Sequence, residues 1–205
     1  YVINWENNGE ELKKFSGSGL GASKYFGCST FVWTKITSYK TSFRYNSGDV
    51  YFDDASPAIV FEGHSDFYIL GFINSKAVDY ILNLLAPTLN FQTGDIKKLP
   101  VILNPILSNS VSEIVNDNIN ISKIDWDSFE TSWGFIKHPF IKGEVLRTKS
   151  EVDGDSTLNS KIFILIKSAY EKWEIDCNTR FNQLKSNEEE LNRIFIDIYG
   201  LQNEL

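Results

Sequence analysis

The sequence predicts an α+β fold, in which a mixed, mostly antiparallel sheet with short helices comes first and a helical C-terminal region follows. Residues 25–62 are rich in aromatic and β-branched residues and contain turn signals such as Asn46-Ser47-Gly48, a composition typical of several short strands. In the second half, apolar residues recur every three or four positions over residues 163–184, which is typical of a helix. This change of period divides the chain into two halves of different structure.

The first half is expected to alternate between strands and short helices. Each expected helix begins at a side chain that can accept a hydrogen bond from a free backbone N–H, and the second ends before Pro87, which cannot continue a helix. We expect strands at residues 50–52 and 58–61, helices at 65–72, capped by Ser65, and at 75–85, capped by Asn74 or Ser75, and an extended segment at 88–103 with a turn at Gly94-Asp95.

The second half is expected to be helical on both sides of an irregular aromatic stretch. Ser186 and Glu189 form an S-x-x-E capping pattern, which predicts that a new helix begins there and ends at Gly200. Two helices joined by a short turn at this point would pack as an antiparallel hairpin. The other expected segments are a helix at 109–121, the aromatic stretch at 122–142, an acidic loop at 151–155 and a long helix over 163–184.

The composition allows one good-sized folded domain, or a domain with an accessory region. Hydrophobic residues make up 42% and aromatic residues 14% of the 205 residues, which is enough for a packed core. No apolar run is long enough to cross a membrane, and no signal-peptide pattern opens the chain. Because the first residue is Tyr1 and the chain contains no Met, we expect an internal piece of a longer cytoplasmic protein, with Cys28 and Cys177 as separate reduced thiols.

The charge is unevenly distributed along the chain. A net charge of −7 argues against a nucleic-acid partner for the chain as a whole. Most of this charge comes from residues 106–205, which contain eleven basic and seventeen acidic residues. Residues 13–48, in contrast, contain six Lys or Arg residues and no acidic residue. The first half therefore contains a long basic stretch that favours contact with DNA phosphates.

The sequence motifs that could indicate catalysis or cofactor binding have simpler structural explanations. Residues 15–19 match the F-x-G-x-G pattern of S-adenosylmethionine sites, but the residues before them are too polar to form the buried strand that such a loop follows. No two prolines are adjacent, so the Asn/Asp-Pro-Pro-aromatic loop of amino-methyltransferases is absent. The acids Asp125, Asp127 and Glu130 lack a matching Lys, and each of the two histidines stands alone. We expect no catalytic residue, cofactor or metal site within this chain.

The basic stretch interleaves positive charges, hydroxyl groups and aromatic rings. Lys and Arg attract phosphates, and together with hydroxyl side chains they also contact base edges. We expect the aromatic residues to serve the core more than to stack on bases. An ordinary exposed β region with core aromatics would have the same pattern, so this alternative stays open. The candidate DNA-binding residues are Lys35, Thr37, Ser38, Lys40, Thr41, Arg44 and Tyr45.

Longer motifs along most of the chain resemble one protein family, the large bacterial adenine-specific DNA methyltransferases. Residues 31–38 and 41–45 are similar to a "TWS-I-S…F-x-x-RY" passage of these enzymes, and residues 50–54 to a "GFIFD" strand. The strongest similarity covers residues 68–76, 89–96 and 99–100, and further similarity covers 125–133, 137–139 and 187–201. The chain resembles the post-catalytic region of PglX-type methyltransferases of phage-exclusion (BREX) systems and of related fused type II restriction-modification enzymes.

The resemblance implies that residues 1–104 form a target recognition domain and that residues 105–205 form the helical region after it. It also implies a parent enzyme that transfers a methyl group from S-adenosylmethionine to adenine N6, in a methyltransferase domain N-terminal to this region. The expected partners are double-stranded DNA, that methyltransferase domain and other subunits of the defence system. A protein-interaction module without DNA contact is the alternative, and the acidic helical half favours it.

Overall fold

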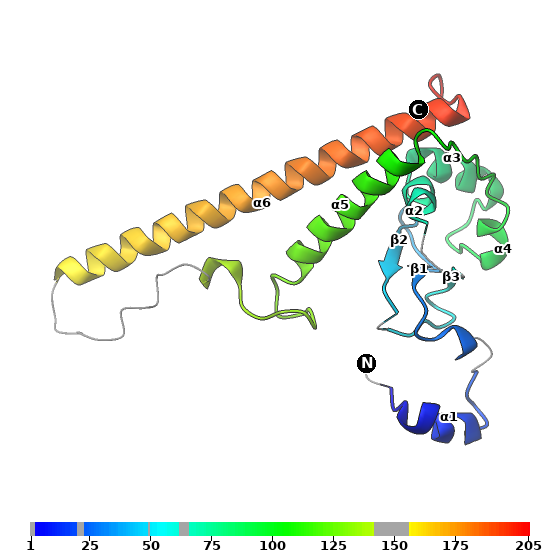
Figure 1. The fold of residues 1–205 in the computed structure, drawn as a ribbon, viewed down its shortest axis with the longest axis horizontal. Coiled ribbons are helices and arrows are strands. Elements are labelled where there is room, and N and C mark those ends of the chain that lie inside the picture. The colour runs from blue at the N-terminus through cyan, green and yellow to red at the C-terminus, as the bar shows by residue number, and fades with distance from the viewer. Residues whose placement is uncertain (1–2, 20–22, 49, 62–65, 142–155) are drawn as a thin grey trace.

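The computed structural model has a small globular unit from which a long helical arm extends (Figure 1). It describes residues 3–19, 23–48, 50–61, 66–141 and 156–205. Within the last of these ranges, residues 156–165 are described by their backbone alone. The globular unit contains a three-stranded antiparallel sheet and short helices, and the arm contains two longer helices. The predicted α+β fold class is confirmed.

The sheet explains where the aromatic residues of the first half lie. Its strands are β1 (Thr30–Trp33), β2 (Phe43–Asn46) and β3 (Ala58–Val60), in the order β2-β1-β3. Both pairs are antiparallel, and Trp33 lies opposite Phe43. Phe31, Trp33 and Phe43 are all buried, because alternate residues of a strand face the same side of the sheet and here that side is covered by α2 (Phe67–Ile73).

Of the two predicted strands named above, one is confirmed and the other is wrong. Residues 58–60 form β3, but residues 50–52 form no strand. The side-chain N–H of Asn46 donates to the backbone carbonyl of Val50 (2.9 Å), and this bond turns the chain away from the sheet. The rings of Tyr51 and Phe52 instead pack on Phe26. Their centroids lie 4.6 Å and 5.5 Å, respectively, from the centroid of the Phe26 ring.

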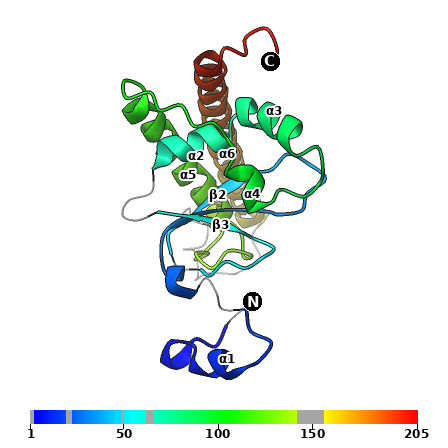
Figure 2. The same ribbon diagram turned by 90° about the vertical axis from the view of Figure 1, so that its right-hand side faces the viewer.

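Trp5 completes this group, with its ring centroid 5.3 Å from that of Phe26. We call Trp5, Phe26, Tyr51 and Phe52 the N-terminal aromatic cluster. The short helical segments near it are Glu6–Asn8, α1 (Glu10–Lys14) and Ser23–Tyr25. Figures 1 and 2 show α1 at the end of the globular unit away from α2, with the sheet between them. The aromatic residues of the first half therefore serve two separate packing centres.

Two short helices follow the sheet, as predicted. α2 begins after Asp66, whose carboxylate accepts a hydrogen bond from the backbone N–H of Tyr68 (2.9 Å). The predicted cap of this helix, Ser65, lies outside the described residues. α3 (Lys76–Leu85) begins after Ser75, whose hydroxyl oxygen accepts a hydrogen bond from the N–H of Val78 (3.4 Å). The Ser75 cap and the end of this helix at Leu85 are confirmed.

The middle of the segment 88–103, where a turn at Gly94-Asp95 was predicted within extended structure, is a short helix. Thr93–Ile96 form α4, because the carboxylate of Asp95 accepts a hydrogen bond from the N–H of Gln92 (3.2 Å) and closes a capping box. Before α4, an antiparallel bridge joins Asn90 to Ile36. After α4 the chain has no regular structure up to the start of the arm.

The arm consists of α5 (Ser108–Trp126) and α6 (Ser156–Tyr199), with the helical turn Pro139–Ile141 between them in the chain. The predicted helix over 109–121 is confirmed, and it continues to Trp126. The two helices are antiparallel, because the side chain of Asn187 donates to Asp117 (3.0 Å) whereas Arg180 lies 3.6 Å from Asp125. The predicted acidic loop at 151–155 lies outside the described residues.

The predicted break at Ser186 is wrong, because α6 runs through it without interruption. An S-x-x-E motif caps a helix only where the preceding backbone is not helical. Here the face that contacts the rest of the protein continues past Ser186 in the same three- and four-residue spacing, so tertiary packing keeps this segment helical. That face comprises Trp173, Cys177, Arg180, Leu184, Asn187, Leu191, Ile194 and Ile198. The hairpin predicted at this point is wrong as well, and the antiparallel pair consists of α5 and α6 instead. α6 ends as predicted at Gly200, whose φ of 64° suits glycine.

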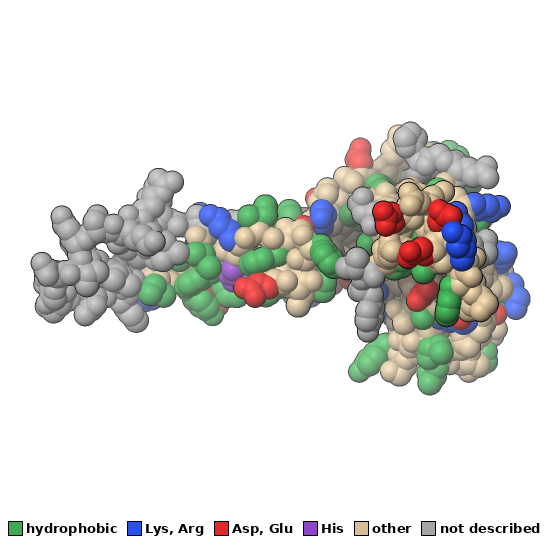
Figure 3. Space-filling model, turned by 90° about the horizontal axis from the view of Figure 1, so that it is seen from below, with side chains coloured by type: hydrophobic (Ala, Val, Ile, Leu, Met, Phe, Trp, Pro, Cys, Tyr) green, Lys and Arg blue, Asp and Glu red, His purple; other side chains and the backbone are tan. Residues whose placement is uncertain are grey.

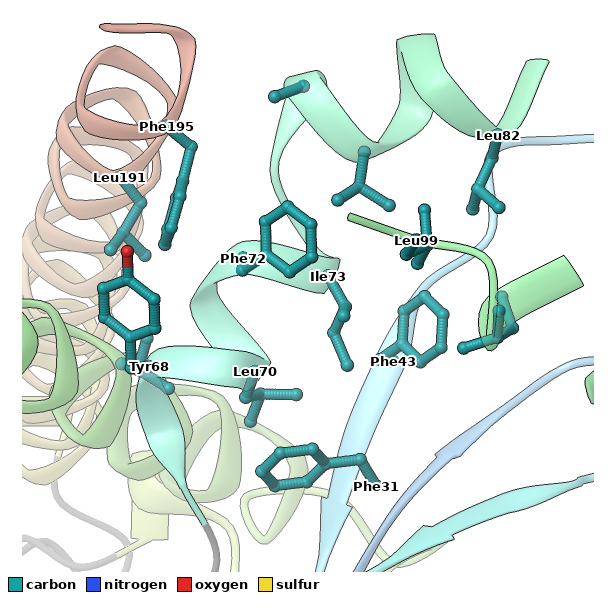
Figure 4. Close-up of a cluster of buried hydrophobic side chains, with 14 of the residues drawn as sticks. Phe31, Phe43, Tyr68, Leu70, Phe72, Ile73, Leu82, Leu99, Leu191 and Phe195 are labelled. Atoms are coloured by element: carbon teal, nitrogen blue, oxygen red, sulfur yellow. The ribbon is translucent and has the colours of Figure 1, made fainter. Parts of the chain in front are cut away.

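The core is continuous from the globular unit into the arm (Figure 4). The ring of Phe195 on α6 lies 5.3 Å from that of Tyr68 and 5.7 Å from that of Phe72, both on α2. Gly71 allows α2 to approach α5, because a Cβ atom at that position would lie 3.0 Å from a methyl group of Val115. The division at residue 104 stays a prediction, and hydrophobic packing crosses it. Within the described part of the chain, no helix is long and apolar enough to span a bilayer.

Candidate nucleic-acid interface

Most of the candidate DNA-binding residues lie on the loop between β1 and β2, which comprises residues 34–42 and which we call the β1–β2 loop. Its backbone is bonded on two sides. The N–H of Lys35 donates to the carbonyl of Ala55 (3.1 Å), and the N–H of Thr37 donates to the carbonyl of Leu89 (2.9 Å). The carbonyl of Lys35 accepts a further bond from the N–H of Phe91 (2.8 Å). These bonds hold the loop between the segment before β3 and the segment before α4.

The first residues of the loop already have partners within the protein. The ammonium group of Lys35 lies 2.7 Å from the carboxylate of Asp54, and its side chain is only 20% exposed. The hydroxyl oxygen of Thr37 accepts a hydrogen bond from the N–H of Tyr39 (3.1 Å), which folds the loop into a local turn. Ser38 is exposed. Lys35 and Thr37 therefore shape the loop, whereas Ser38 faces solvent.

Lys40 is exposed and forms an ion pair with Asp79 on α3, with 3.0 Å between the nitrogen and the nearer oxygen. Burial raises the pKa of the Asp79 carboxyl, and the hydrogen bond and charge of Lys40 offset part of that rise. An ion pair at the surface contributes little to stability, on the order of 1 kcal/mol or less. Lys40 can therefore leave Asp79 for a phosphate at small cost.

The remaining candidates divide between the two faces of the sheet. Thr41 is only 3% exposed, and its hydroxyl has no hydrogen-bond partner within the described residues. Tyr45 is half-buried, and its ring packs at 6.3 Å on Phe31 and 5.3 Å on Phe67. Arg44, on the opposite face of β2, is exposed and forms no ion pair with any described side chain. Among the seven candidates, Ser38, Lys40 and Arg44 have side chains that face solvent.

The loop also exposes two residues that were not among the candidates. Tyr39 is 86% exposed and Ile36 is 66% exposed. Trp33 and Phe43, at the two ends of the loop, are in contrast buried in the core. A signal for this difference was present in the sequence, because Tyr39 stands in the polar run Thr37-Ser38-Tyr39-Lys40, outside the alternating pattern that places aromatic residues in the core.

A second exposed surface lies along the arm. The space-filling view shows several hydrophobic side chains on this face of the arm, next to basic, acidic and histidine side chains (Figure 3). Large exposed apolar residues come from the end of α5, from the segment after it and from α6. They include Trp126, Phe129, Trp133, Ile136, Tyr170, Ile175 and Phe181, which we call the arm surface.

The patterns considered for chemistry have structural roles where they are described. The F-x-G-x-G pattern follows the helix α1, and its Ser18 hydroxyl donates to the carbonyl of Leu12 (2.6 Å). Hydrogen bonds from Ser132 and Lys123 lower the pKa of the Asp127 carboxyl. His138 packs between Phe129 and Trp173. Within the described residues, no group of three His, Cys, Asp or Glu side chains could hold a metal ion.

Comparison with known proteins gives two relatives of this chain. An adenine-specific methyltransferase, PglX of Lacticaseibacillus casei (strain Zhang), is 35% identical over 213 aligned residues that cover the whole chain. The chain is homologous to the PglX/BrxX adenine-specific methyltransferases. An adenine-specific methyltransferase, BrxX of Escherichia coli O9:H4 (strain HS), is 39% identical over 150 residues, or 71% of the chain. No family model matches the chain.

The homology covers only a small part of each relative. The chain spans 16% of the length of PglX and 12% of the length of BrxX. The resemblance predicted from the motifs is therefore confirmed, and it concerns a segment of a much larger protein in both relatives.

Proposed function

We propose that this segment recognises DNA on behalf of a larger adenine-specific DNA methyltransferase of a BREX phage-defence system. In this proposal it binds duplex DNA in the bacterial cytoplasm and positions a target adenine for a methyltransferase domain that lies elsewhere in the same protein. That domain would bind S-adenosylmethionine and transfer its methyl group to N6 of adenine. The segment itself would contribute binding and no chemistry.

The observation that carries this proposal is the set of polar and basic side chains exposed on the β1–β2 loop and on the outer face of β2. It presents the hydroxyl of Ser38 and the charges of Lys40 and Arg44 from a backbone that is bonded on two sides. A basic side chain without an ion pair within the described residues, as for Arg44, is suited to phosphate contact or to bidentate contact with guanine. The homology to adenine-specific methyltransferases supplies the reason to expect DNA as the ligand.

The test is the binding of the 205-residue chain to a random-sequence duplex, measured by fluorescence anisotropy over a range of salt concentrations. We expect affinity to fall steeply with salt, because bound Lys and Arg release counterions from the DNA. Lys40→Ala combined with Arg44→Ala should weaken binding. For each phosphate that the variant no longer binds, the slope of log affinity against log salt should fall by about 1.

A matched control removes the same charge from the arm. Lys172 and Lys185 are both exposed, and Lys185 pairs with Glu189 as Lys40 pairs with Asp79. Lys172→Ala combined with Lys185→Ala should leave the salt dependence unchanged. Equal effects of the two double variants would mean that affinity depends only on net charge, and the proposed surface would be wrong.

The arm surface favours a second candidate function, a protein-interaction module within a defence complex. Trp126, Trp133 and Phe181 are more exposed than large apolar residues usually are in a protein without a partner. Absence of DNA binding at low salt would favour this candidate. The two functions are compatible, because the loop and the arm are separate parts of the molecule (Figure 1).

A further inference from the structure

We propose that Tyr39 stacks against a nucleobase of bound DNA and fills the space that an adenine leaves when it is turned out of the helix. This inference rests on the proposed function, since it assumes that the β1–β2 loop meets DNA. It assigns a separate role to one side chain of that loop, because Ser38 and Lys40 would contact the backbone or base edges while Tyr39 would enter the base stack.

Tyr39 differs from the other aromatic residues near the β1–β2 loop, because those residues pack in the core. Trp33 and Phe43 are 1% and 5% exposed, and the indole N–H of Trp33 donates to the backbone carbonyl of Phe91 (3.0 Å). Tyr45 packs on Phe31 and Phe67. Tyr39 makes no ring contact with another described aromatic residue and is 86% exposed. Its ring therefore contributes little to the folded state and is free to meet a ligand.

The backbone on both sides of Tyr39 is held in place. The N–H of Tyr39 donates to the hydroxyl of Thr37 (3.1 Å), and the N–H of Thr37 donates to the carbonyl of Leu89 (2.9 Å). On the other side, the side chain of Thr41 is buried, at 3% exposed. A ring on an anchored loop loses less conformational freedom on binding than a ring on a free loop, so more of its stacking energy appears as affinity.

The chemistry around the ring suits a base in the duplex. An aromatic ring stacks on any base, because every base has a π face, and one such contact changes affinity by about tenfold. Ser38 and Lys40 precede and follow Tyr39 in the chain and are exposed, so a hydroxyl and an ammonium group are available for contact with the sugar–phosphate backbone near the stacked base. Removal of a base from the stack costs free energy, and a ring that replaces its stacking contacts would offset part of that cost.

A duplex with an abasic site tests this role without the methyltransferase domain, because the base is already missing. We expect the 205-residue chain to bind the abasic duplex about tenfold more tightly than the intact duplex of the same sequence. Tyr39→Ala should abolish this preference, so that the variant binds the abasic and the intact duplex equally, while affinity for both still falls with salt. Tyr39→Phe should keep the preference, because the ring and not the hydroxyl makes the stacking contact.

Trp133→Ala is the matched control, because Trp133 is 88% exposed on the arm, as Tyr39 is on the loop. It should keep the preference for the abasic duplex. A preference that survives Tyr39→Ala, or that is absent from a wild-type chain that binds intact DNA, would overturn the inference and leave the proposed function standing. Absence of salt-dependent binding to both duplexes would overturn both together.

Discussion

Apolar residues recur with the spacing of a helix at both ends of α6, but the two ends differ in what they contact. At the C-terminal end, Leu191, Ile194 and Phe195 are buried against α2 and α5. Toward the other end, Tyr170 and Phe181 are large and apolar as well, yet they are exposed. A periodic apolar pattern therefore predicts a helix in both places, whereas burial depends on whether other elements of the fold reach that stretch.

The largest expected effect tests this difference directly. Phe195→Ala should lower the free energy of unfolding by about 3–5 kcal/mol, because it leaves a cavity beside Tyr68 and Phe72. Phe181→Ala removes the same side chain where it is 65% exposed and should change stability by less than about 0.5 kcal/mol. Urea unfolding followed by circular dichroism measures both. Similar losses for the two variants would show that the distal end of the arm is also packed in solution.

The next effect concerns the close approach of α2 and α5. Gly71→Ala adds a Cβ atom 3.0 Å from a methyl group of Val115 and 3.1 Å from one of Val111. Overpacking destabilises the folded state by about 1–3 kcal/mol, whereas the higher helix propensity of Ala stabilises it by at most about 1 kcal/mol. We expect a net loss of stability in the same unfolding assay. The loss should shrink in a Val115→Ala background, and an equal loss there would rule out the clash as its cause.

A smaller effect is expected where the arm is held by polar contacts. The side-chain amide of Asn187 donates to Asp117 (3.0 Å) and to Asn118 (2.8 Å) across the pair of helices. Asn187→Ala should cost about 1–2 kcal/mol, because it leaves these groups without their partner. Hydrogen exchange should accelerate in α5 more than in the sheet. Asn182→Ala, at an exposed position of the same helix, is the control and should leave exchange unchanged.

The smallest effect is the pH dependence that Asp79 contributes. Its raised pKa means that the folded state binds the proton more tightly than the unfolded chain does. The stability from this carboxyl is therefore fully present below the usual Asp pKa of about 4, and it is lost as the pH rises through the higher value of the folded state. Asp79→Asn should flatten the fall in stability over that range. An unchanged fall in the Asp79→Asn variant would contradict this prediction.

Much of the fold could be predicted because it depends on local chemistry. Ser75 caps α3 as expected, and Gly200 ends α6 as expected, because a hydroxyl next to a free N–H and a glycine at positive φ act through their immediate neighbours. Residues 50–52 misled the prediction because Tyr51 and Phe52 suit an aromatic cluster as well as they suit a strand. Local composition does not separate these two outcomes, since both bury the same side chains.

The candidate site was predicted less completely than the fold. The basic stretch located the β1–β2 loop, and Ser38, Lys40 and Arg44 are indeed exposed there. The same criterion also selected Thr41, which is buried, and it passed over Tyr39. Charge and hydrogen-bonding capacity belong to a residue type, whereas exposure depends on the neighbours that the folded chain brings to it.

The sequence by itself determined the α+β class, the antiparallel pairing of short strands, the start of α3 and the end of α6, and it revealed the relation to PglX-type methyltransferases. Only the tertiary structure decided that α6 continues past Ser186, that Phe195 belongs to the same core as Tyr68, and that Tyr39 is exposed while Trp33 is buried. The physical reason is the range of the interactions. Caps, turns and periodicity act within a few residues, whereas burial is set by contacts between segments that lie far apart in the chain.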